Sequence, residues 1–153
     1  MPTLELDNGM FIAEILPICE YLDEKHGSSS LVGTTPEERA ETRMWCRRLD
    51  LQILEPLANG FRFSEGLALF KSRIRTIPQA ADDLKTLAQE RLTWLDGQMA
   101  GKQFICGDRF TLADILLWVF LEFGGQVGQP LNAANKNIAA WYERVKARPT
   151  SAA

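Results

Sequence analysis

The chain has 153 residues, of which 46% are hydrophobic and 24% charged, which is typical of one globular domain of ordinary size. Its 20 acidic residues against 17 Lys and Arg give a net charge of −3, which argues against nucleic acid or an anionic membrane surface as partner. Three scattered cysteines and a single histidine argue against a disulfide framework and a metal site. The longest apolar run, 115–121, is far shorter than the ~18 residues of a membrane span. We therefore expect a cytoplasmic protein without metal or membrane partner.

The N-terminal part of the chain predicts a β-hairpin followed by a helix. Residues 3–6 and 10–12 read as short strands joined by the Asp-Asn-Gly turn at 7–9. Apolar residues then recur at helical spacing until Gly27 provides a stop. Pro17 is compatible with this helix only in its first turn.

A serine-rich stretch, 28–34, reads as a linker, and a second helix follows it. Thr35 and Glu38 have the spacing of a capping box, and Pro36 stands at the first helical position, where its missing N–H costs nothing. We expect Pro56 to kink or end this helix.

The remainder of the chain predicts further helices and no strand. A helical segment begins at Leu67 and stops before Pro78, and a long amphipathic helix runs from there to Met99. A last helix, 138–145, presents a mainly apolar face.

The central helix is predicted at 112–123, and it is apolar on nearly every side. Thr111 and Asp114 form a capping box at its start, in which Asp stands where Glu or Gln is usual. We expect a structural role for both residues. Replacement of Asp114 by Ala should cost ~1 kcal/mol through the cap.

Two separated groups of residues carry a resemblance to a known family. Residues 2–9, Glu14 and residues 18–22 resemble the second half of the thioredoxin-like domain of glutathione transferases. Residues 107–114 look like the capping box of the central helix in that family's all-helical domain, and residues 141–149 are similar to its closing helix. The resemblance covers most of the chain.

The resemblance implies a mainly α fold, in which a glutathione transferase C-terminal-like helical bundle is preceded by a partial thioredoxin-like β-hairpin and helix. The units are expected at 1–27, 28–34 (linker) and 35–153. It also implies a homodimer whose intact form transfers or conjugates glutathione to small hydrophobic electrophiles. The alternative is a non-catalytic domain for dimerisation or protein interaction.

Glutathione-binding positions follow from the resemblance as well. In the family, a cis proline such as Pro2 exposes the backbone of the residue before it to the cysteinyl part of glutathione, and a Glu-Ser pair that opens the next helix holds the γ-glutamyl end. The matching positions are Met1, Glu14 and Ile15. Because Ile15 has no hydroxyl, one hydrogen bond to a charged group is lost, at ~1.5–3 kcal/mol, and weak glutathione binding is expected.

No catalytic residue is assigned. The family's Tyr, Ser or Cys lies in a β-α-β unit that would precede Pro2, so we expect a shortened transferase of doubtful activity. The hairpin should then pair with a second subunit or be poorly ordered.

Phe61 and Phe63, in a predicted loop, either line a pocket for the electrophile or fill the core. Trp118 is expected in the core. Cys46 and Cys106 are expected to be buried, inert thiols.

Overall fold

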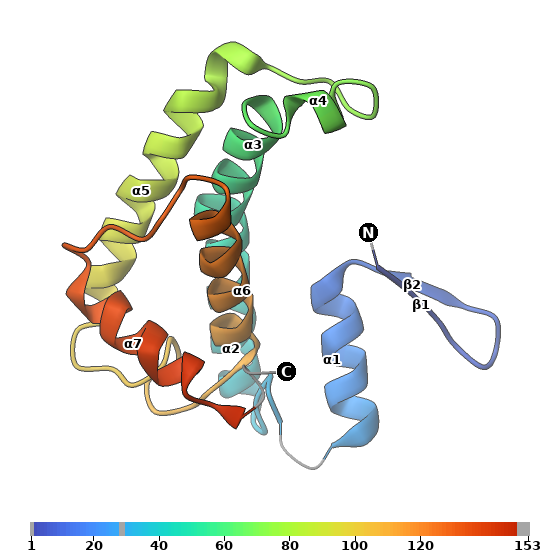
Figure 1. Ribbon diagram of the computed structural model, residues 1–153. Helices are drawn as coiled ribbons and strands as arrows, with labels where there is room; N and C mark the ends of the chain where they lie inside the picture. The colour runs from blue at the N-terminus through green and yellow to red at the C-terminus, as the bar shows by residue number, and fades with distance from the viewer. Residues whose placement is uncertain (1, 28–29, 150–153) are drawn as a thin grey trace.

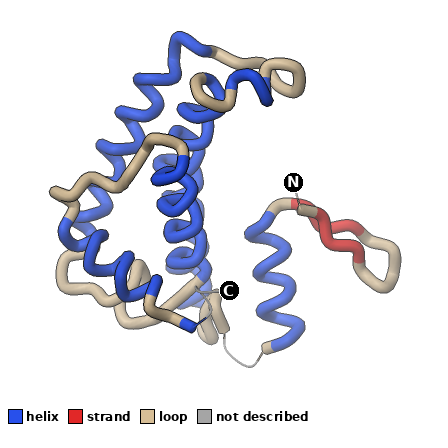
Figure 2. The backbone as a smooth tube through the Cα atoms, in the orientation of Figure 1, coloured by secondary structure: helices blue, strands red, loops and turns tan. Residues whose placement is uncertain are grey.

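The computed structural model describes residues 2–27 and 30–149, which form a mainly helical structure with one small antiparallel sheet (Figures 1 and 2). None of the described helices is long and apolar enough to cross a membrane. The elements in chain order are β1 (Thr3–Glu5), β2 (Phe11–Ala13), α1 (Ile15–His26), α2 (Pro36–Leu49), the π-helix η1 (Asp50–Leu54), α3 (Glu55–Phe63), α4 (Leu67–Phe70), the 3-10 helix η2 (Pro78–Ala80), α5 (Ala81–Gln98), α6 (Leu112–Gln126) and α7 (Lys136–Lys146).

The hairpin is confirmed; β1 is one residue shorter than predicted, and β2 has the predicted length but begins one residue later. Leu4 pairs with Ile12 at the centre of the sheet, and Gly9 adopts a φ of +81° in the turn, where a residue without Cβ is favoured. Met10 and Phe11 are exposed, at 52% and 64%. That the hairpin pairs with a second subunit stays a prediction.

Helix α1 is confirmed and stands beside the helical bundle (Figure 1). Pro17 is its third residue, where no intrahelical bond requires its N–H. Near the other end of α1, Asp23 accepts hydrogen bonds from the amides of Leu31 and Val32, at 2.9 and 3.2 Å, which fixes the chain as it enters the bundle.

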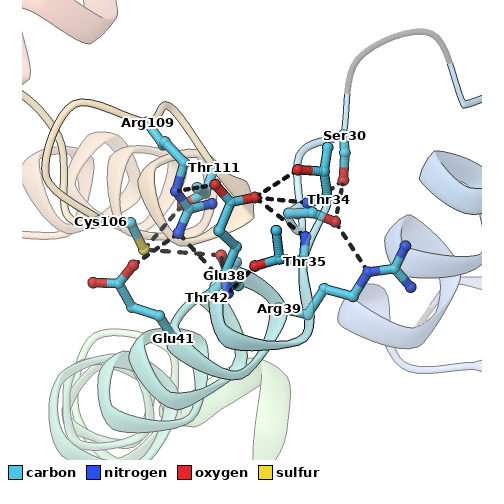
Figure 3. A network of polar contacts seen from close by, with 11 residues as sticks. Ser30, Thr34, Thr35, Glu38, Arg39, Glu41, Thr42, Cys106, Arg109 and Thr111 are labelled. Atoms are coloured by element: carbon cyan, nitrogen blue, oxygen red, sulfur yellow. Dashed lines mark hydrogen bonds and ion pairs between the residues drawn. The ribbon is translucent and has the colours of Figure 1, made fainter.

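The start of α2 is the predicted capping box (Figure 3). The Glu38 amide donates to Thr35 Oγ1, at 3.2 Å, and the Glu38 carboxylate accepts from the Thr34 amide, at 2.7 Å. Arg109, from the loop before α6, reaches Glu41 at 2.8 Å and Glu38 at 3.8 Å. These contacts join the start of α2 to the loop before the central helix.

Pro56 was expected to kink or end the helix that begins at Pro36, but α2, η1 and α3 follow one another without a gap and form one rod that continues to Phe63. The α-helix ends at Leu49, η1 follows, and the Glu55 amide bonds the Asp50 carbonyl five residues earlier. Pro56 then lies in the first turn of α3. The rod changes its hydrogen-bonding pattern ahead of the proline and does not break.

Two predictions in the following segment were wrong. Phe61 and Phe63 lie in α3 and not in a loop, because the glycine before them, Gly60, is buried and continues the helix. The helix predicted from Leu67 to the residue before Pro78 is reduced to the single turn α4, and the next helical turn, η2, begins only at Pro78.

The central helix α6 is capped as predicted. Asp114 is fully buried; its Oδ2 accepts from the Thr111 amide and hydroxyl, and its Oδ1 accepts from the Ile105 amide and the Trp141 indole. One carboxylate therefore joins α6, the preceding loop and α7. Among the described residues, Trp141 has the largest fully buried side chain.

Candidate functional site

A cleft of about 590 Å³ lies between the start of α1 and the rod formed by α2, η1 and α3. Its lining combines charged side chains, among them Glu14 and Arg43, with apolar side chains, among them Leu116 and Phe120 of α6. Its lining residues are Glu14, Ile15, Leu16, Pro17, Glu20, Arg43, Cys46, Arg47, Asp50, Leu54, Glu55, Ala58, Arg62, Leu116 and Phe120. A lining that mixes charged and apolar side chains is typical of a site for an amphipathic ligand.

The start of α1, which lines the cleft, combines a strained backbone with unpaired amides. Glu14 has φ 70° and ψ 130°, and no other non-glycine residue in the described ranges has a positive φ. The N–H groups of Ile15 and Leu16 make no hydrogen bond within the described part of the chain, and Pro17 has none to donate. Strain of this kind persists where the surrounding structure enforces it, as at ligand sites. The two amides lie at the positive end of a twelve-residue helix and suit an anion.

The arginines on the cleft wall nearest α1 are partnered. Arg43 donates two hydrogen bonds to one carboxylate oxygen of Glu20, at 2.8 and 3.1 Å, and this contact raises the pKa of the Arg43 guanidinium. Arg47 lies 3.6 Å from Asp50. Both arginines are mostly exposed, so the pairs add little stability, but they offset the positive charge on this wall.

An apolar pocket of about 360 Å³ adjoins the cleft and shares Ala58, Arg62 and Phe120 with it. The rings of Phe61 and Phe123 meet edge to face, with centroids 5.2 Å apart, and Phe61 also contacts Phe70 at 6.1 Å. The complete lining is Ala58, Phe61, Arg62, Phe70, Val119, Phe120 and Phe123.

Of the two phenylalanines named from the sequence, the structure brings only Phe61 to this pocket. Phe63 is 8% exposed and belongs to the core. The α6 side chains of the pocket were missed, although Leu116, Phe120 and Phe123 recur at the spacing of one helical face, which is the signal that could have found them.

No thiol of the cleft is prepared for nucleophilic chemistry. Burial raises the pKa of the Cys46 thiol to about 12, and burial also raises the pKa of Cys106. Both are buried, as predicted, and the thiolate that would react is suppressed. Met1, and with it the bond to Pro2, lies outside the described residues. Within those residues no group of three His, Cys, Asp or Glu side chains is placed to hold a metal ion.

This architecture matches proteins of one family. Residues 61–149 match the family "Glutathione S-transferase, C-terminal domain". The chain is 30% identical over 155 residues to "Glutathione S-transferase 2" of Saccharomyces cerevisiae, covering 98% of this chain and 64% of the relative. It is 29% identical over 151 residues to "Glutathione S-transferase stcT" of Emericella nidulans, covering 97% and 66%. Over 127 residues it is 31% identical to "Elongation factor 1-gamma" of Schizosaccharomyces pombe, covering 81% of this chain and 29% of that protein.

Solved structures agree in fold across nearly the whole chain. Gtt2 from Saccharomyces cerevisiae superposes with a TM-score of 0.91 at 29% identity, and the match covers 99% of this chain and 73% of the Gtt2 chain. A glutathione S-transferase domain-containing protein from Marinobacter aquaeolei VT8 has a TM-score of 0.91 at 32% identity, covering 99% and 74%. The chain thus spans 64% to 66% of the length of the two curated transferases. It belongs to the glutathione S-transferase family.

Proposed function

We propose that the cleft binds glutathione at the start of α1 and a small hydrophobic electrophile in the adjoining apolar pocket. The observation that carries this proposal is the strained Glu14, followed by the unpaired amides of Ile15 and Leu16, in the lining of a cleft that adjoins an aromatic pocket. The family membership supports glutathione as the ligand, since the relatives are named for it.

In the proposed complex, the γ-glutamyl carboxylate accepts hydrogen bonds from the amides of Ile15 and Leu16, and the helix dipole favours its negative charge. The Glu14 carboxylate faces the γ-glutamyl ammonium. Met1 would offer its backbone to the cysteinyl part. The glutathione sulfur then points along the cleft toward the apolar pocket, where the electrophile lies.

The reaction is the family's conjugation or transfer. The glutathione thiolate forms a carbon–sulfur bond with the electrophile, the leaving group departs with the electron pair of the broken bond, and the thiol proton passes to solvent. None of the described cleft residues is assigned the role of activating the thiol, because the only thiol there has a raised pKa. The proposal concerns the form of the protein that carries a thiol-activating Tyr, Ser or Cys. That form is proposed to be a cytoplasmic homodimer, with units at 1–27 and 35–153 joined by 28–34.

Glutathione binding tests this assignment directly. We expect weak binding by isothermal titration calorimetry and a gain of about one to two decades in affinity in Ile15→Thr, which supplies a hydroxyl at the helix start. Ile15→Val is the matched control, because Val has the shape of Thr without its oxygen. Glu14→Gln should weaken binding. Equal affinities of the Thr and Val variants, or no binding by any of them, would contradict the proposal.

Turnover is a separate measurement. Protein from its native source should conjugate glutathione to chlorodinitrobenzene, with loss of activity in a variant that fills the pocket. Conjugation that survives a filled pocket would place the electrophile elsewhere.

A non-catalytic dimerisation or interaction domain is the second candidate. It is favoured by the similarity to elongation factor 1-gamma over 127 residues, a protein named for translation and not for transfer. A stable dimer in analytical ultracentrifugation, together with no retention on glutathione-agarose, would favour this candidate.

A further inference from the structure

The apolar pocket contains one charged side chain, that of Arg62, and its setting is unusual. Every other lining residue is Ala, Val or Phe, and no carboxylate lines the pocket. Arg62 is half-buried and has no ion pair in the described part of the chain. A cation on an apolar wall normally has a carboxylate partner, since leaving it unpaired away from water is costly.

Arg62 is nevertheless held in place. Its Nη1 donates to Asn59 Oδ1 at 3.0 Å, and Asn59 donates in turn to Glu55 at 2.8 Å, so three residues of one face of α3 are linked. The guanidinium also lies over the Phe70 ring, 5.8 Å from its centroid. These contacts fix the orientation of the group but use only one of its five N–H donors.

The remaining donors of Arg62 have no acceptor in the described residues. The side chain lines both the cleft and the apolar pocket, so it stands where they join. Any ligand whose apolar part fills the space among Phe61, Phe120 and Phe123 passes beside it. A planar guanidinium with free donors in such surroundings matches a carboxylate, sulfonate or phosphate oxygen.

We propose that Arg62 makes the pocket selective for apolar, aromatic acceptor molecules that carry an anionic group. This inference rests on the proposed function, because it names the class of electrophile taken by the same site. The aromatic part lies against the phenylalanines, and the anionic group accepts hydrogen bonds from Arg62. A neutral molecule of the same shape gains only the apolar contacts, so the pocket discriminates by the charge of the ligand.

Binding of two fluorescent probes tests the proposal without glutathione or turnover. Anilinonaphthalene sulfonate and phenylnaphthylamine share the same aromatic rings, and only the first carries an anion, which does not titrate in the usable pH range. We expect Arg62→Met to weaken sulfonate binding at least about tenfold and to change phenylnaphthylamine binding less than about twofold. Arg62→Lys should recover part of the sulfonate affinity.

Two further variants locate the effect. Arg73→Met removes an exposed arginine that lines neither cavity, and it should leave both affinities unchanged. Val119→Trp fills the pocket from a residue that is 49% exposed, and it should weaken both probes.

The selectivity is refuted if Arg62→Met weakens both probes equally, if it weakens neither, or if the unmodified protein binds neither probe. Because these measurements need no glutathione, a protein that binds the sulfonate through Arg62 but binds no glutathione in calorimetry would refute the proposed function and leave the pocket's selectivity standing.

Discussion

Asp114 offers the sharpest test of what holds the helical bundle together. Its Oδ1 accepts from the Ile105 amide at 2.9 Å and the Trp141 indole at 2.8 Å, and its Oδ2 accepts from the Thr111 amide at 2.8 Å and hydroxyl at 3.1 Å. All four residues are at most 1% exposed. Water therefore cannot replace a lost acceptor without a rearrangement of the core.

Asp114→Ala leaves three buried N–H groups without an acceptor. At ~1–3 kcal/mol for each orphaned donor, with partial relaxation, the loss in the free energy of unfolding should be about 3–5 kcal/mol. This loss exceeds the ~1 kcal/mol of a helix cap, because two of the four donors, the Ile105 amide and the Trp141 indole, lie outside the capping box. Asp114→Asn keeps two acceptor contacts and should lose about 2–3 kcal/mol.

Urea unfolding followed by far-ultraviolet circular dichroism measures these values. Asp108→Ala is the control, because Asp108 is exposed in the same loop and should change stability by less than about 0.5 kcal/mol. Asp114 does not line the cleft or the pocket, so probe affinity should be unchanged in variants that remain folded. If Asp114→Ala loses only about 1 kcal/mol, the four hydrogen bonds of Asp114 do not act as a buried network. If it loses probe affinity at unchanged stability, Asp114 does not have the purely structural role assigned to it.

Three other predictions concern separate parts of the molecule. Gly124→Ala should lower the free energy of unfolding by about 1–3 kcal/mol in thermal unfolding, because the added Cβ would lie 2.9 Å from a carbonyl oxygen of the following loop. A Cβ at Gly125 meets nothing within 4 Å, so Gly125→Ala should raise the free energy of unfolding by about 0.5–1 kcal/mol. A change of the same sign in both variants would contradict this prediction. A hydrogen bond from Lys85 lowers the pKa of the Glu65 carboxyl from the ordinary value of 4.5 to about 2. The stability that this contact contributes is therefore present above pH 4.5 and is lost as the pH falls toward 2. In Lys85→Met, the titration midpoint of Glu65, measured by carbon NMR, should return toward 4.5. Cys46, with a pKa raised to about 12, has a thiolate fraction of roughly 10⁻⁴ at pH 8 and should be alkylated only after unfolding, as peptide mass spectrometry would show.

Local signals in the sequence were sufficient for the helix starts. The capping boxes at Thr35 and Thr111 depend on side chains three residues apart, so both could be recognised without knowing the fold. The contacts of Asp114 with Ile105 and Trp141 could not be recognised in this way, because they depend on how α6 and α7 pack.

The path of the chain after Pro56 was harder to predict because of Gly60. A glycine before two aromatic residues suggests a break, yet a Cβ at Gly60 would lie 2.7 Å from the Lys85 side chain on α5, so close packing of helices explains the glycine. In the segment after α4, Ile74 and Ile77 are 43% and 40% exposed, so these apolar side chains lack the packing that would stabilise the helix predicted there.

The candidate site was only partly predictable. Glu14 and Ile15 were predicted from the family resemblance. The positive φ of Glu14 and the unpaired amide of Ile15 could not be predicted, because they depend on how the chain folds between β2 and α1. The spacing within α6 could have shown the face that carries Phe120, but no pattern within α3 or α6 shows that this face meets Arg62.

The π-helix η1 has a consequence for insertions and deletions. Its turn holds one residue more than an α turn, because the Glu55 amide bonds the carbonyl five residues earlier instead of four. Loss of one residue within Asp50–Leu54 is therefore absorbed by conversion of the π turn into an α turn, which keeps Ala58 and Arg62 on the face that lines the cleft. Loss of one residue elsewhere in the rod has no such turn to absorb it and would rotate α3 by about 100° relative to α2, so this short segment is where homologues can differ in length and still present the same surface.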